Sequence, residues 1–102
     1  MTFAAPGILA RAGVNVAIHM DTTGSTALLP IFAGLAVRAG MAEEDALKAI
    51  TINAARVSGV ADRVGSLEKG KDADVIVLSG HPFDLMTHVE RVFVNGQAAY
   101  IE

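Results

Sequence analysis

The chain has 102 residues, a net charge of -3 at pH 7 and no cysteine. This length suffices for one small domain and excludes a large multidomain protein, since domains usually hold about 100–150 residues. The missing cysteines exclude disulfides, thiolate zinc sites and cysteine nucleophiles, and the scattered basic residues form no stripe that could bind a phosphate backbone. We therefore expect no nucleic-acid partner and take the cytoplasm as the compartment.

The apolar content is high, with 52% hydrophobic residues of which few are aromatic. No apolar run approaches the ~20 residues that a membrane span needs. The N-terminal stretch has no basic start and is interrupted by Pro6 and Gly7, which is not typical of a signal peptide. We expect a soluble chain without a membrane partner.

The first half predicts helices around one short strand. A helix is expected within residues 3–12, and the β-branched run Val14 to Ile18 is typical of a strand that is buried on both faces of a parallel sheet. A polar loop, 19–25, leads into a helix over 26–39 that is apolar nearly all round.

Two further short helices and three strands follow. One helix is predicted over 43–50, with three acidic residues in its first turn, and another ends near Ser58 after a cap at Thr51 or Asn53. The run from Val75 to Leu78 predicts a strand, and Asn95-Gly96 predicts a type I′ hairpin between strands over 89–94 and 97–101. The strand at 14–18 has no sheet neighbour nearby in the sequence, so we expect the chain to be a piece of a larger fold.

Asp21 is the leading candidate for chemistry. It follows the expected end of a buried strand, which is where parallel α/β folds place functional groups. The alternative is that Asp21 only forms an Asx-turn or caps the next helix. His19, two residues earlier, would point the same way on an extended strand and is a weaker candidate for a metal ligand.

The remaining polar residues give weaker indications of a functional site. His81 and His88 match no compact zinc motif, and we expect both to be structural or solvent-facing. Gly24 and the hydroxyls around it lack the pattern of a phosphate loop, and neither glycine-serine pair forms a nucleophile elbow.

A resemblance to a known family rests on three blocks. Residues 63–78, RVGSLEKGKDADVIVL, resemble the C-terminal signature of amidohydrolase-superfamily enzymes. Residues 13–21, GVNVAIHMD, resemble the last barrel strand of those enzymes, and residues 39–56 resemble the helices that follow it. The similarity covers nearly the whole chain and is greatest to the imidazolonepropionase-like branch, which includes prolidase-like members.

The resemblance implies an α/β fold, the C-terminal part of a (β/α)₈ TIM-type barrel plus strands of a small composite β-sandwich. Residues 1–62 would be the last βα part of the barrel, and residues 63–102 would supply the strands of the sandwich. It also implies that Asp21 binds a divalent metal, zinc by family analogy, and takes a proton from the attacking water. The reaction would be hydrolysis of a C–N bond in a small-molecule amide, cyclic or peptide-like.

The departures from the family pattern define what the chain lacks. The family's His-x-His pair, its bridging lysine or glutamate and its two later histidines all precede the region present here, so the metal would need ligands from elsewhere. Met20 and Thr22-Thr23 flank Asp21 where relatives usually show other residues, which leaves the substrate open. We expect the isolated chain to be incomplete and to self-associate or to bind a complementing N-terminal chain. The alternative is a non-catalytic interaction module derived from the same fold.

Overall fold

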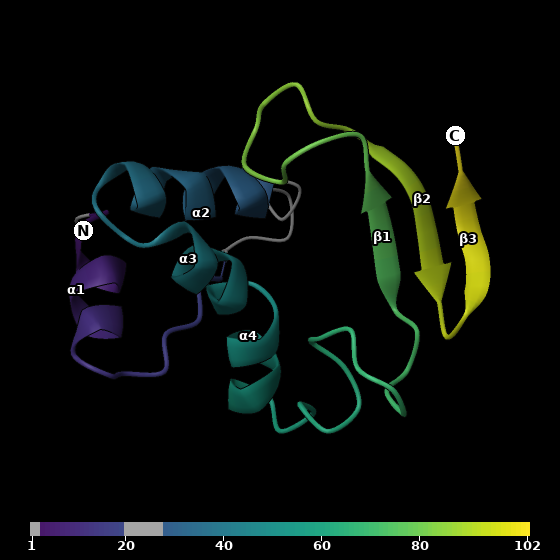
Figure 1. The fold of residues 1–102 in the computed structure, drawn as a ribbon, viewed down its shortest axis with the longest axis horizontal. Coiled ribbons are helices and arrows are strands. Elements are labelled where there is room, and N and C mark those ends of the chain that lie inside the picture. The colour runs from purple at the N-terminus through teal and green to yellow at the C-terminus, as the bar shows by residue number, and fades with distance from the viewer. Residues whose placement is uncertain (1–2, 20–27) are drawn as a thin grey trace.

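The computed structural model describes residues 3–19 and 28–102, and in these ranges the helices lie on one side and a sheet on the other (Figure 1). Helix α1 lies on the helical side, and the chain ends at the far edge of the sheet (Figure 1). The elements in chain order are α1 (Ala5–Arg11), α2 (Leu29–Arg38), α3 (Glu43–Ala49), α4 (Ile52–Val57), β1 (Val75–Leu78), β2 (Val89–Val94) and β3 (Gln97–Ile101). Within the described ranges, no helix combines the length and apolar character that crossing a bilayer requires.

The helices agree with the sequence-based prediction except at one cap. Helix α3 carries Glu43, Glu44 and Asp45 in its first turn, where the helix dipole favours acidic side chains. Thr51 is the N-cap residue of α4 but makes no side-chain capping bond. Its hydroxyl instead donates to the Leu47 carbonyl oxygen at 2.7 Å, at the end of α3. The prediction of the position was correct, and the prediction of the capping bond was wrong, since the hydroxyl turns back to the preceding helix.

The core lies among the helices and is built from small side chains. The buried cluster consists of Ala33, Ala36, Met41, Ala46 and Ala49. Alanines at a helix contact let the backbones approach closely, so α2 and α3 pack without large interdigitating side chains. No large side chain within the described ranges is fully buried, which makes this a thin core.

The prediction of a strand at Val14–Ile18 was wrong for the chain as described. Residues 14–19 belong to no helix or strand. A strand requires a hydrogen-bonded neighbour, and the three strands in the described part of the chain pair only with one another. Within the segment, Val16 and Ile18 pack against the helical core.

The sheet is antiparallel, with the order β1-β2-β3. Asn95 and Gly96 join β2 to β3 with φ angles of 51° and 80°. Two successive positive φ angles define the type I′ turn, so the hairpin prediction is confirmed. The turn is fixed further by Asp74, whose Oδ1 accepts the Asn95 N–H at 2.8 Å. No residue of the three strands is fully buried.

Loops connect the helices to the sheet. In the described chain, Cα atoms of helices and strands nowhere come within 8 Å of each other. Phe83, in the loop between β1 and β2, packs against the alanine core. Gly65 lies against α4, where an added Cβ would stand 2.8 Å from the Cβ of Ala55 and where φ is 99°. These two loop contacts bring the regions together.

Candidate functional site

Asp21, the predicted catalytic and metal-binding residue, lies outside the described residues. The assignment of its role therefore stays a prediction. His19 is the last described residue before it and is exposed. The structure does describe how the segment that leads to Asp21 is anchored to the helices.

Hydrogen bonds fix residues 14–19 from the helical side, and the two shortest that join distant parts of the chain involve Ile18 and Val16. The N–H of Ile18 donates to the carbonyl oxygen of Ala49 at 3.0 Å, at the end of α3. The side-chain amide of Asn53, in the first turn of α4, donates to the carbonyl oxygen of Val16 at 3.1 Å, and this bond is partly buried. Both bonds connect residues more than thirty positions apart, so they set the position of the segment relative to the helices.

Asn53 is itself oriented by a neighbour. Arg56 Nη1 donates to Asn53 Oδ1 at 3.0 Å. Because the oxygen of the amide is occupied by a cation, its nitrogen is left to face the Val16 carbonyl. The sequence interpretation treated Asn53 only as one of two candidate helix caps, with Thr51, and missed this role. The only signal was that Asn53 and Arg56 lie at the end of the block 39–56, which resembles the amidohydrolases.

His81 is structural, as predicted. Its Nδ1 accepts the N–H of Phe83 at 3.1 Å, and its Nε2 lies 2.7 Å from Glu43 Oε1. The accepting Nδ1 places the proton of a neutral ring on Nε2, where it is donated to the carboxylate. The pair links the β1–β2 loop to the start of α3 beside Phe83, so its function is to join the two regions.

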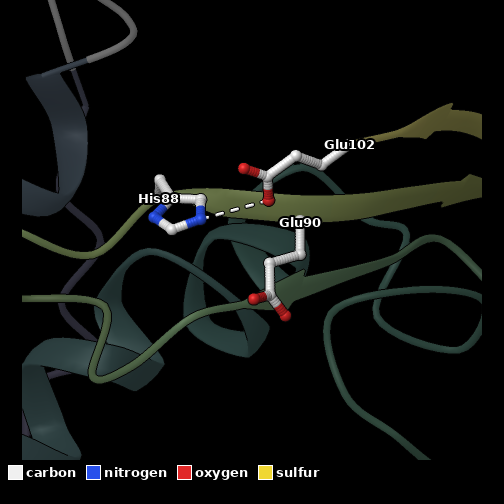
Figure 2. A group of neighbouring side chains, drawn as sticks. All are labelled: His88, Glu90 and Glu102. Carbon is white, nitrogen blue, oxygen red and sulfur yellow. Dashed lines mark hydrogen bonds and ion pairs between the residues drawn. The ribbon is translucent and has the colours of Figure 1, made fainter.

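His88, Glu90 and Glu102 form the one group of three or more potential metal-ligating side chains in the described ranges (Figure 2). One ligand atom from each residue lies within 4.8 Å of the other two. His88 Nε2 is 3.1 Å from Glu102 Oε2. His88 and Glu102 are exposed, as the sequence predicted for His88, and Glu90 is half-buried. The sequence pattern did not bring these three residues together.

The block 63–72, which carries the family signature, forms a closed turn. Arg63 binds Asp72 through its side chain, with Nη2 to Oδ2 at 2.9 Å, and its carbonyl accepts the Asp72 N–H at 2.7 Å. Lys71 donates to the Ser66 hydroxyl at 2.7 Å, with its side chain only 11% exposed. These bonds give the polar residues of the signature a structural role in shaping the connection between α4 and β1.

Comparison with known proteins agrees with the resemblance in the sequence. The profile of the Amidohydrolase family matches residues 1–99. A crystal structure of an amidohydrolase from Thermotoga maritima superimposes with a TM-score of 0.94 at 40% identity, over 100% of this chain and 27% of that chain. The chain therefore belongs to the amidohydrolase family, whose fold is of the TIM-barrel type.

Curated relatives with two different activities are similar to the chain. It is 42% identical over 82 residues to the imidazolonepropionase of Syntrophobacter fumaroxidans, covering 76% of this chain and 19% of that protein. It is 41% identical over 88 residues to a 5-methylthioadenosine/S-adenosylhomocysteine deaminase of Teredinibacter turnerae, covering 76% of this chain and 20% of that protein. The chain thus spans about a fifth of the length of these relatives.

Proposed function

We propose that the chain is part of a metal-dependent amidohydrolase that hydrolyses C–N bonds of small amides, with Asp21 as a metal ligand and proton acceptor. The family match over residues 1–99 carries this proposal. The names of the relatives support it, since both an imidazolonepropionase and a deaminase break C–N bonds. Residues 1–62 would form the last βα part of the barrel, and residues 63–102 the strands of the small β-domain.

The donor chemistry of the chain fits a contributing role. A carboxylate at Asp21 and an imidazole at His19 are suitable ligands for zinc or a similar divalent ion, but two donors do not complete a site. Among the described residues, the only other potential ligand group lies on the sheet and excludes His19. Further ligands would have to come from residues outside this chain. When bound, such a metal supplies a water of lowered pKa.

The residues of this chain would position Asp21 and move a proton. Asn53 and the Ala49 carbonyl hold residues 14–19, and this anchoring would position Asp21, which follows in the sequence. The Asp21 carboxylate would accept a proton from the attacking water. It would then return that proton to the nitrogen that leaves as the C–N bond breaks.

The exposed apolar surface supports an incomplete assembly. Leu67 is 84% exposed, Ile76 is 56% exposed and Tyr100 is 49% exposed. Apolar surface on both the turn and the sheet is typical of a face that a further part of the protein covers. The same observation favours the second candidate, a non-catalytic module that uses these faces to self-associate.

The substitution Asp21→Asn separates the two candidates. In an assembly that contains the remaining barrel segments, we expect hydrolysis of cyclic amides to fall about 10²–10⁴-fold, because a positioned acid–base group contributes about that much. Ammonia release or ring opening gives the rate, and circular dichroism checks the fold. The exposed Glu68→Gln variant is a matched control that should keep full activity. Full activity of Asp21→Asn would contradict the role of Asp21, whereas a folded wild-type assembly that hydrolyses no amide would contradict the hydrolase and favour the module.

A further inference from the structure

The pairing of β2 with β3 gathers His88, Glu90 and Glu102 at one end of the sheet (Figure 2). His88 directly precedes β2 and Glu90 is the second residue of that strand, so along extended backbone their side chains, two positions apart, lie on the same face. Arg91 pairs with Ile101, and the N–H of Glu102 donates to the Glu90 carbonyl at 2.9 Å. Glu102 is therefore directly opposite Glu90, and the three side chains share a face by register.

This placement of charges is unfavourable without a further cation. Two carboxylates directly opposite each other on neighbouring antiparallel strands repel. No lysine or arginine in the described ranges comes within 4.0 Å of the carboxylate of Glu90 or Glu102. The neighbouring group is the His88 imidazole, which is a neutral ligand for transition metals when unprotonated.

The ligand types and spacing suit a divalent transition metal. Zinc binds imidazole nitrogen and carboxylate oxygen at about 2.0–2.2 Å, which places two ligands of a tetrahedral site about 3.3 Å apart. His88 Nε2 and Glu102 Oε2 already stand at 3.1 Å. Glu90 offers a carboxylate oxygen within 4.8 Å of both of these ligand atoms.

We propose that His88, Glu90 and Glu102 form a surface site for a divalent transition metal, with zinc as the preferred ion and one coordination position open to water. The site is separate from the region of Asp21 and does not rest on the proposed hydrolase activity. Its effect would be structural. An ion bound to β2 and β3 together holds the edge strand in place, since binding to the folded state alone stabilises that state.

Calorimetric titration of the full chain with Zn²⁺, without a histidine tag and in the Asp21→Asn background, tests the proposal. We expect one ion per chain with a micromolar Kd, an increase in Tm on adding Zn²⁺, and slower amide exchange in β3. His88→Gln and Glu102→Gln should each weaken binding at least tenfold and remove the rise in Tm. His81→Gln is the matched control, because it removes an imidazole from the other exposed histidine–glutamate pair.

Two results would overturn the site. The first is the absence of saturable Zn²⁺ binding to a folded chain. The second is binding that does not depend specifically on the proposed ligands, either because it survives both His88→Gln and Glu102→Gln or because it is lost equally in His81→Gln. Because His88 and Glu102 are exposed, circular dichroism is expected to show their variants folded. Should one fail to fold, Glu90→Gln supplies the same comparison.

Discussion

The helical region and the sheet differ in how far their apolar side chains are buried. Around α2 and α3, Ala33, Ala36, Ala46 and Ala49 are almost completely buried. In the sheet, Ile76, Val94, Tyr100 and Ile101 are each about half exposed or more. Backbone hydrogen bonds and a well-formed turn therefore suffice to order the three strands, while close side-chain packing is confined to the helices. The sheet is the region whose stability depends more on whatever covers it.

The largest loss of stability is expected from a substitution that overfills the helical core. Ala46→Leu inserts three carbon atoms where the native side chain is 0% exposed. We expect the free energy of unfolding to fall by about 3 kcal/mol, since added volume in a packed core forces strain. Urea denaturation followed by circular dichroism measures it. Ala39→Leu, at the exposed end of α2, is the control, and equal losses in both would show that the helices are not tightly packed.

The next largest loss of stability is expected from removing a contact between the helical region and the sheet region. Phe83→Ala removes the aromatic ring that packs against the alanine core from the β1–β2 loop. We expect a loss of about 2 kcal/mol, below the ~3–5 kcal/mol of a fully buried phenylalanine because Phe83 is half-buried. Leu85→Ala, in the same loop and 77% exposed, should change stability little. A neutral Phe83→Ala would mean that the regions do not depend on this contact.

A smaller effect is expected at the anchor of residues 14–19. Asn53→Ala removes the bond to the Val16 carbonyl, which should lower stability by about 1 kcal/mol. Hydrogen exchange should become faster at Ile18, whose N–H is bonded to Ala49 in the same segment, and stay unchanged in β2. Asn15→Ala removes a longer, exposed bond of 3.5 Å and serves as the comparison. If hydrogen exchange at Ile18 is unchanged in Asn53→Ala, Asn53 does not hold residues 14–19 in place.

The smallest effect is expected on the charged surface. Glu44 and Lys48 form an exposed i,i+4 pair on α3 with 3.3 Å between Oε1 and Nζ. Glu44→Gln should lower stability by no more than about 0.5 kcal/mol, because such pairs are solvated and screened by salt. The same denaturation experiment, repeated at high salt, should abolish the difference. A loss as large as that of Phe83→Ala would show that surface charge, rather than apolar packing, holds the helical region.

Local sequence signals predicted the elements well and the contacts poorly. Asn95-Gly96 determined its turn because only residues that tolerate positive φ fit a type I′ hairpin, and this requirement is local. The prediction at Val14–Ile18 failed because a strand needs a partner, which no local pattern supplies. Asn53 was read as a cap because residues of its type prefer that position, whereas the side chain faces a carbonyl 37 residues away.

By itself, the sequence determined the order of the helices and of the last three strands, the family signature of residues 63–78 and the choice of Asp21 as the candidate for catalysis. These depend on residue type and spacing over a few positions. Only the tertiary structure decided that Asn53 and Arg56 anchor residues 14–19 and that Phe83 joins the sheet region to the helices. It also decided that the β2–β3 register places His88, Glu90 and Glu102 together. Such contacts join positions far apart in the chain, and their geometry exists only after packing and strand pairing have formed.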